Sequence, residues 1–136
     1  LLGSKSGKVI LIVEDNEDLR FTVKEALISA DNMVLEAGNG KEALDILNDK
    51  TNQNPDLILL DLMMPKMNGF EFLEAYRNQF KKQVPVIVIT GADLDENDKK
   101  LLSSETSRVL EKSSMSDTGI ADHLVETIES VAGVSK

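Results

Sequence analysis

The chain has 136 residues, which suits one domain with a single hydrophobic core. It carries 24 acidic and 15 basic residues, and the formal net charge of −9 argues against direct binding to nucleic acid. Cysteine is absent and His123 is the only histidine, so disulfides, thiolate zinc sites and clusters of imidazole ligands are excluded.

The first residues of the chain show no hydrophobic periodicity. We expect residues 1–8 to be a linker remnant or a segment added in cloning, and the domain to span residues 9–133. No apolar run approaches the roughly 20 residues that a membrane span requires, and the start lacks the regions of a signal peptide. We therefore expect a cytoplasmic domain that makes no membrane contact of its own.

Short apolar runs then alternate with amphipathic stretches. Residues 9–13 form an uninterrupted, largely β-branched run, which is typical of a strand covered on both faces in a parallel sheet. We expect further strands at residues 33–37, 57–60, 86–89 and 108–110. The intervening patterns predict helices at residues 17–30, 41–50, around Leu73, Tyr76 and Phe80, at 96–103, and along a last stripe of Ile120, Leu124, Ile128 and Val131, widened by Ala121 and Val125.

This alternation predicts the fold class. Strands that alternate with helices five times favour an α/β protein with a parallel sheet and helices on both faces, because crossover connections are right-handed. We expect a flavodoxin-like, doubly wound sheet of five strands in the order 2-1-3-4-5, with five helices.

Polar residues follow the predicted strands at one edge of this sheet. Glu14 and Asp15 come directly after the first strand, Asp61 after the third, and Thr90 and Lys112 after the fourth and fifth. Ligands of such sheets bind beyond the carboxyl ends of the strands, where the strand order reverses between strands 1 and 3. We therefore expect the three carboxylates to converge, with Thr90 and Lys112 beside them.

Crowded carboxylates repel one another unless a cation compensates them. The three negative charges and the positive charge of Lys112 leave a formal charge of −2, which one divalent ion neutralises. An all-oxygen site without histidine suits Mg²⁺. The group is similar to a phosphoryl-transfer site, in which one carboxylate attacks phosphorus while the metal, the ammonium and a hydroxyl hold the equatorial oxygens.

Four motifs carry a resemblance to a known family. They are Val13-Glu14-Asp15-Asn16, Asp61-Leu62-Met63-Met64-Pro65-Lys66-Met67-Asn68-Gly69, Thr90 after an apolar strand, and Leu110-Glu111-Lys112. Together they resemble the bacterial response-regulator (CheY-like) receiver domain of two-component signalling, over residues 9–131. The second motif is the most specific, because an aspartate followed at fixed offsets by Met-Pro, Met and Gly rarely arises by chance.

The resemblance implies a phosphorelay. Asp61 would be the phosphoacceptor, receiving a phosphoryl group from a histidine of a histidine kinase or histidine phosphotransfer domain. Asp15 and Asp61 would ligate Mg²⁺ directly, Glu14 would act through water, and the backbone carbonyl of Met63 would complete the protein ligands. Such a domain phosphorylates itself and is no enzyme on its own.

The resemblance also implies a switch. Thr90 and Lys112 would bind the phosphoryl oxygens, and a shift of Thr90 would change the surface of the fourth helix, fifth strand and last helix, where partners bind and where a homodimer is expected. Val109 stands where most relatives carry a switch Tyr or Phe, and Ser113 where they carry Pro. The stretch from residues 94–98 through 109–114 is similar to C-terminal receivers of hybrid sensor histidine kinases, which makes such a kinase a candidate parent.

Other functions stay open from the residues alone. A small Mg²⁺-dependent phosphatase of the haloacid type also uses a strand-end aspartate, but it needs a second aspartate where Met63 stands. A flavodoxin-like FMN carrier needs a Ser/Thr/Gly-rich loop after the first strand, which is acidic here. The last alternative is a pseudo-receiver, an interaction module that is not phosphorylated.

Each site residue also has a structural interpretation. Asp61 could cap the following helix, and Glu14-Asp15 could be a solvated turn. Thr90 could serve only as a strand former, and Lys112 could be an ordinary surface lysine.

Overall fold

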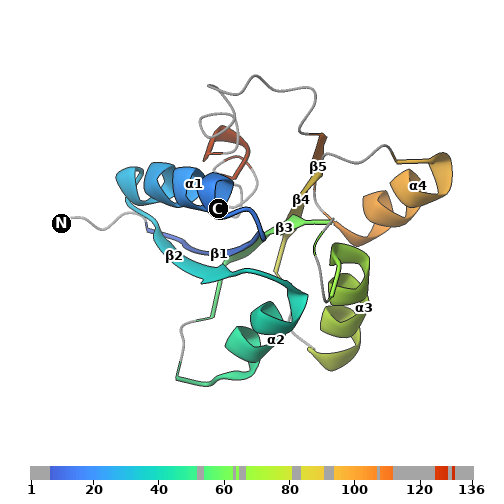
Figure 1. The fold of residues 1–136 in the computed structure, drawn as a ribbon, viewed down its shortest axis with the longest axis horizontal. Helices are drawn as coiled ribbons and strands as arrows, with labels where there is room; N and C mark the ends of the chain where they lie inside the picture. The colour runs from blue at the N-terminus through green and yellow to red at the C-terminus, as the bar shows by residue number, and fades with distance from the viewer. Residues whose placement is uncertain are drawn as a thin grey trace.

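A computed structural model describes residues 7–51, 54–62, 64, 67–80, 84–90, 94–106, 108–111, 125–128 and 130, without the side chains of residues 105 and 111. Five parallel strands form one sheet in the order β2-β1-β3-β4-β5 (Figure 1). The strands are β1 (Val9–Val13), β2 (Met33–Ala37), β3 (Leu57–Asp61), β4 (Val86–Thr90) and β5 (Arg108–Glu111).

Helices connect the strands in sequence order. They are α1 (Glu17–Ser29), α2 (Gly40–Asn48), α3 (Gly69–Gln79) and α4 (Glu96–Glu105), and the helical residues 125–128 and 130 follow β5. The predicted doubly wound, flavodoxin-like fold with this strand order is confirmed.

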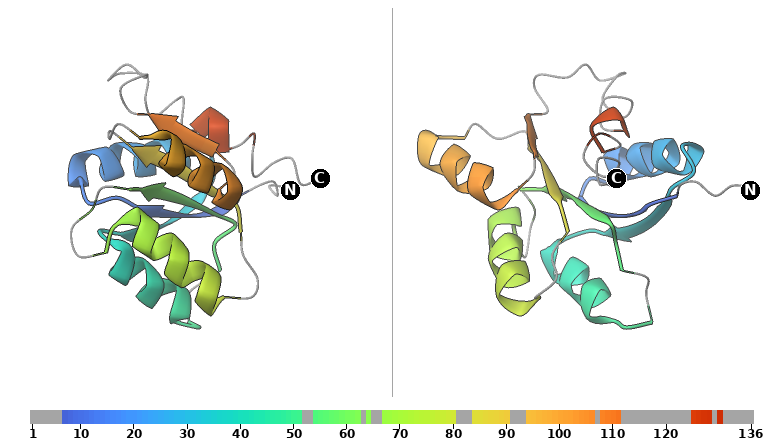
Figure 2. Two further views of the ribbon diagram at one scale, coloured as in Figure 1. Left: turned by 90° about the vertical axis from the view of Figure 1, so that its right-hand side faces the viewer. Right: turned by 180° about the vertical axis from the view of Figure 1, so that it is seen from behind.

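The two faces of the sheet bury different side chains, because successive residues of a strand point to opposite faces. Leu11, Ile58 and Val88 belong to the cluster that packs against α2, α3 and α4. Ile10, Leu59, Ile87 and their neighbours pack against α1 and Ile128. Figures 1 and 2 show α1 and the last helical residues on one side of the sheet and α2 and α3 on the other. This covering explains why β1, β3 and β4 read as continuous apolar runs.

The predicted helix at residues 41–50 was wrong at both ends, and its caps give the reason. Asn39 caps α2 by accepting a hydrogen bond from the Glu42 backbone N–H at 2.9 Å, so Gly40 already belongs to the helix. At the other end, the Asp49 carboxylate accepts from the backbone N–H and the hydroxyl of Thr51, at 2.9 and 2.6 Å. Such local bonds favour a turn over a further helical turn, so α2 ends at Asn48.

The end of α1 stores backbone strain at Asp31, whose φ is 72°. Only glycine adopts this left-handed region without a steric cost from Cβ. We expect Asp31→Gly to raise the free energy of unfolding by about 0.5 kcal/mol, because the relief exceeds the extra chain entropy of glycine. Urea denaturation measures this change. Asp31→Ala keeps the Cβ atom and should give no gain, and an equal gain from both variants would contradict the explanation.

Parts of the expected last helix lie outside the described residues. Ile128 is buried, and Val125 is half-buried, in the hydrophobic cluster between the sheet and α1, as the stripe predicted. The remaining members, Ile120, Ala121, Leu124 and Val131, together with His123 and Ser113, fall outside the described ranges. Among the helices that are described, none has the length and apolar character that crossing a membrane requires.

Candidate functional site

Three carboxylates from two segments of the chain meet at the carboxyl edge of the sheet. Glu14 and Asp15 follow β1, and Asp61 is the last residue of β3. Because β1 pairs with β3 and Val13 lies opposite Leu60, the residues that follow these two, Glu14 and Asp61, come at the same level of the sheet edge. Each residue offers one carboxylate oxygen, and these oxygens all lie within 4.8 Å of one another. The convergence expected from the strand order is therefore present.

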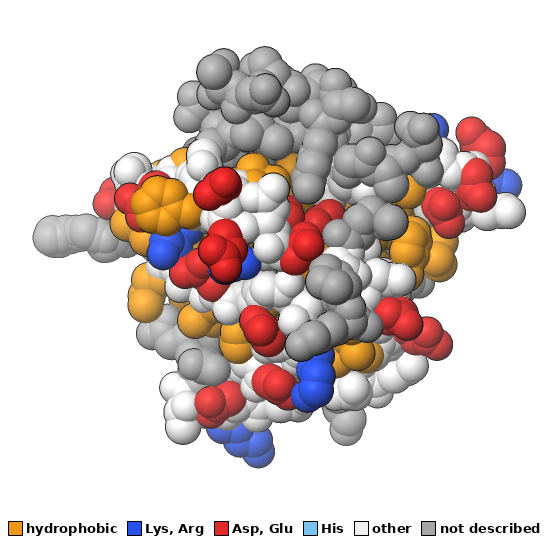
Figure 3. All heavy atoms as spheres, viewed as in Figure 1, with side chains coloured by type: hydrophobic (Ala, Val, Ile, Leu, Met, Phe, Trp, Pro, Cys, Tyr) orange, Lys and Arg blue, Asp and Glu red, His pale blue; other side chains and the backbone are white. Residues whose placement is uncertain are grey.

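Burial makes this group of charges unusual. Asp61 and Glu14 are only 2% and 3% exposed, whereas Asp15 lies open to solvent. Two unit charges about 4 Å apart near a protein surface interact with roughly 4 kcal/mol. Figure 3 shows that acidic side chains also gather near the middle of the face drawn in Figure 1. The three-oxygen donor set without nitrogen or sulfur fits a hard divalent cation such as Mg²⁺.

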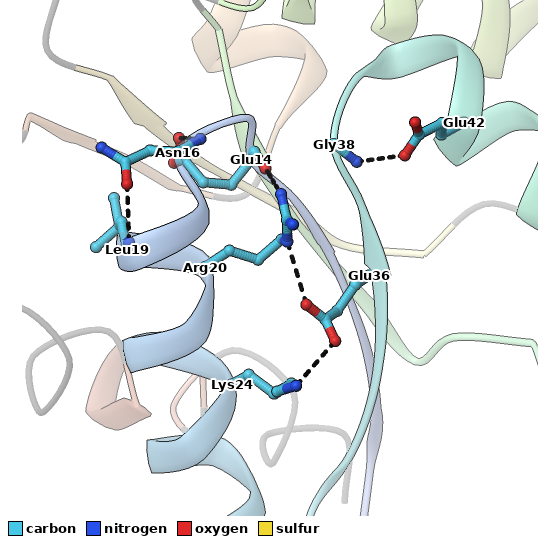
Figure 4. A network of polar contacts seen from close by, with 8 residues as sticks. All are labelled: Glu14, Asn16, Leu19, Arg20, Lys24, Glu36, Gly38 and Glu42. Carbon is cyan, nitrogen blue, oxygen red and sulfur yellow. Dashed lines mark hydrogen bonds and ion pairs between the residues drawn. The ribbon is translucent and has the colours of Figure 1, made fainter.

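The turn that carries Glu14 and Asp15 is fixed by backbone contacts. The Glu14 N–H donates to the Ala37 carbonyl at 3.0 Å, so the turn begins as an extension of the β1–β2 pairing. The Glu14 side chain accepts from the Asn16 N–H at 3.1 Å. Asn16 in turn caps α1 by accepting from the Leu19 N–H at 3.0 Å (Figure 4). The acidic pair is therefore held between the end of a strand and the start of a helix.

Gly69, the first residue of α3, lies close to the backbone at the end of β3. The Gly69 N–H donates to the Leu62 carbonyl at 2.9 Å. A Cβ atom on Gly69 would lie 2.7 Å from the Leu62 Cα and 2.9 Å from the Asp61 carbonyl oxygen. No side chain fits there without displacing the backbone of Asp61. This contact explains why the Asp61–Gly69 motif ends in glycine. The sequence alone did not reveal that reason.

Asp61 does not cap the helix that follows it. Asn68 holds that position, and its side chain accepts from the Glu71 N–H at 2.9 Å while Glu71 accepts from the Asn68 N–H at 3.0 Å. This reciprocal capping box satisfies the start of α3. The interpretation of Asp61 as a helix cap is therefore wrong, and its burial at the strand end needs another explanation.

Thr90 lies at the same edge of the sheet, on the neighbouring strand. It is fully buried, and it follows Ile89, which lies opposite Asp61 in the β3–β4 register. Thr90 lies opposite Glu111, the last residue of β5. Lys112 and Met63, the other two expected site residues, lie outside the described residues.

A second group of charges beside the acidic turn was missed by sequence reasoning. Arg20 and Lys24 of α1 both pair with Glu36 of β2, at N–O distances of 3.1 Å (Figure 4). The spacing of four residues places both basic side chains on one helix face, which is a weak signal that the sequence did contain. Arg20 also reaches the Glu14 carbonyl, with a distance of 2.6 Å between Nη1 and the oxygen.

The fold, the acidic group and the motifs agree with a family comparison. Residues 10–126 match the family model described as the response regulator receiver domain. The chain belongs to this family.

Relatives of this receiver domain include complete regulators and separate domains. It is 43% identical over 88 residues to the transcriptional regulatory protein CpxR of Escherichia coli K12. The aligned residues make up 63% of this chain and 35% of CpxR. The chain thus spans about a third of the length of this curated relative. In structure it is similar to the receiver domain of Francisella response regulator 1452, with a TM-score of 0.79, 27% identity and coverage of 96% and 100% of the two chains.

A third similar protein was solved with a metal ion. The response regulator TrrA of Thermotoga maritima, in complex with Mg²⁺-BeF, gives a TM-score of 0.71 and 29% identity over 91% of this chain and 98% of that one.

Proposed function

We propose that this receiver domain accepts a phosphoryl group on Asp61 in a reaction that depends on Mg²⁺. The observation that carries the proposal is the meeting of Glu14, Asp15 and Asp61 oxygens within 4.8 Å at the strand ends of a receiver fold. Asp61 is buried at the end of a central strand, and it does not cap the helix that follows. A carboxylate kept in this position suits a nucleophile.

The chemistry is the transfer of one phosphoryl group. A carboxylate oxygen of Asp61 forms a bond to phosphorus while the phosphorus–nitrogen bond of a phosphohistidine donor breaks, and the donor imidazole keeps the electron pair and takes up a proton. Asp15 and Asp61 would hold Mg²⁺ directly, Glu14 through water, and the Met63 carbonyl would be a further ligand. Mg²⁺ would supply positive charge to the phosphoryl oxygens. Thr90 and Lys112 would bind the same oxygens.

The proposal includes partners and a readout. The donor is a histidine kinase or a histidine phosphotransfer domain in the cytoplasm, and phosphorylation changes the surface of α4, β5 and the last helix, which contacts the partner or a second copy of the domain. Val109 on β5 is half-buried opposite Val88, so a β-branched side chain takes the position of an aromatic switch residue. A hybrid sensor kinase is one parent in which such a domain would act.

Acetyl phosphate with and without Mg²⁺ tests the proposed function. Wild-type protein incubated with this small donor should gain the mass of one phosphoryl group in intact-mass spectrometry when Mg²⁺ is present, and should gain none when EDTA removes the ion. Equal modification in both samples would contradict the proposed metal dependence. Mg²⁺ binding without any modification would indicate an interaction module, and release of phosphate with rapid turnover would indicate a phosphatase.

Asp15→Asn should weaken Mg²⁺ binding, because one anionic ligand is replaced by a neutral amide. We expect the dissociation constant to rise roughly tenfold, which corresponds to about 1.4 kcal/mol. Isothermal titration calorimetry measures the change. Asp18→Asn is a matched control, since Asp18 is an exposed acid of the first α1 turn outside the acidic group. If both variants bind as tightly as the wild type, the metal lies elsewhere.

A further inference from the structure

We propose that Arg20 is a positioning residue for the metal site. It fixes the peptide between Glu14 and Asp15, and thereby sets the direction in which the Asp15 carboxylate leaves the backbone. This inference rests on the proposed function, because it concerns the residues expected to hold Mg²⁺. Arg20 itself contacts neither the metal nor the phosphoryl group in this proposal.

The guanidinium of Arg20 joins three elements. Its Nη1 donates to the Glu14 carbonyl at 2.6 Å, and its Nε donates to Glu36 Oε1 at 3.1 Å. Lys24 Nζ lies 3.1 Å from Glu36 Oε2, so the Glu36 carboxylate is held from both sides (Figure 4). The start of α1, the end of β1 and strand β2 are therefore connected through one planar group. Arginine suits this role because its donors have a fixed geometry.

Fixing the Glu14 carbonyl constrains Asp15 directly. The Glu14 carbonyl and the Asp15 N–H share one planar peptide unit. The Glu14 N–H is already bound to the Ala37 carbonyl at 3.0 Å, so the contact with Arg20 leaves little rotation on either side of Glu14. Asp15 is exposed and is placed by the backbone that carries it. Residues that orient metal ligands commonly control metal affinity in this way.

The basic side chains of this network are partly shielded from solvent. The side chains of Arg20, Lys24 and Glu36 are 19%, 27% and 36% exposed. Desolvation acts to raise the pKa of Glu36, but hydrogen bonds and charge from Lys24 and Arg20 outweigh it and lower this pKa. Glu36 therefore stays ionised near neutral pH and holds the guanidinium in place.

Charge and positioning predict opposite effects when Arg20 is replaced. The loss of a positive charge beside three carboxylates would, by electrostatics alone, tighten the binding of Mg²⁺. The loss of the contact with Glu14 would loosen the ligand geometry and weaken binding. Lys24 offers a matched control, because Lys24→Ala removes the same charge and a bond to Glu36, whereas the contact with the Glu14 carbonyl is made by Arg20.

The experiment compares Mg²⁺ affinities by isothermal titration calorimetry at constant ionic strength. We expect Arg20→Ala to raise the dissociation constant roughly tenfold, and Lys24→Ala to leave it unchanged or lower it. Millimolar guanidinium chloride should restore the affinity of Arg20→Ala, whereas equal sodium chloride should not. Arg20→Met retains the apolar stem that packs on the fold, so it repeats the test if the alanine variant fails to unfold cooperatively in urea.

The outcomes separate this inference from the proposed function. If wild-type protein binds Mg²⁺ and is phosphorylated while Arg20→Ala and Arg20→Met bind Mg²⁺ as tightly or more tightly, the positioning role is overturned and the function stands. If both Arg20 and Lys24 variants weaken binding equally, or if guanidinium restores nothing, the contact with Glu14 is not the cause and the role is again overturned. If wild-type protein binds no Mg²⁺, both proposals fail.

Discussion

Asp61→Asn is expected to abolish phosphorylation of the domain. The amide is nearly the same size and shape as the carboxylate, but it lacks the anionic oxygen that attacks phosphorus. Wild-type protein treated with acetyl phosphate and Mg²⁺ should gain the mass of one phosphoryl group, and the variant should gain none under identical conditions. This is the largest expected effect of any substitution in the chain, because it removes the proposed reacting atom and one proposed metal ligand together.

Asp45→Asn provides the matched control for this experiment. Asp45 lies on α2, its side chain is 69% exposed, and its ion pair with Lys41 at 3.6 Å is a surface contact of little energetic weight. It should be modified as wild-type protein is. Peptide mapping of the phosphorylated wild type should place the group on Asp61. A modified Asp61→Asn protein, or a phosphoryl group on another residue, would overturn the assignment of the acceptor.

Gly69→Ala should destabilise the fold and slow phosphorylation together. The new Cβ atom would lie 2.7 Å from the Leu62 Cα and 2.9 Å from the Asp61 carbonyl oxygen, so the backbone of Asp61 and Leu62 must move. Overpacking of this kind costs typically about 1–3 kcal/mol. We expect the free energy of unfolding in urea to fall by that amount. On the proposed function the rate of phosphorylation should fall as well, because the Asp61 carboxylate would be displaced from the position that the reaction requires.

Gly38→Ala separates this close approach from the general effect of adding a methyl group. A Cβ atom on Gly38 meets the flexible ends of Glu42 and Arg20 at 3.4 and 3.7 Å, and its φ is not positive. The change should be neutral or stabilising by up to about 1 kcal/mol, through the reduced entropy of the unfolded chain. Equal losses from both variants would show that the contact between Gly69 and Leu62 is not the cause.

The strands were predictable because their signal is local. β1 and β2 begin and end at the expected residues, and β3, β4 and β5 each extend one residue further than expected. Buried parallel strands need continuous apolar runs, so composition alone marks them. Helix ends were less predictable. The Asp49 side chain ends α2 through hydrogen bonds to Thr51, which compete with one more helical turn. The spacing of hydrophobic residues does not reflect such polar contacts.

The sequence by itself determined which residues stand at the carboxyl ends of the strands, because each apolar run stops at a polar residue. The alternation of strands with helices also limits the possible strand orders. That was sufficient to bring Glu14, Asp15 and Asp61 together. Only the tertiary structure decided that Arg20 donates a hydrogen bond to the Glu14 carbonyl and that Gly69 lies against the Asp61 backbone. Both depend on distances of a few ångströms between separate elements, which follow from packing and register and leave no periodic pattern in the chain.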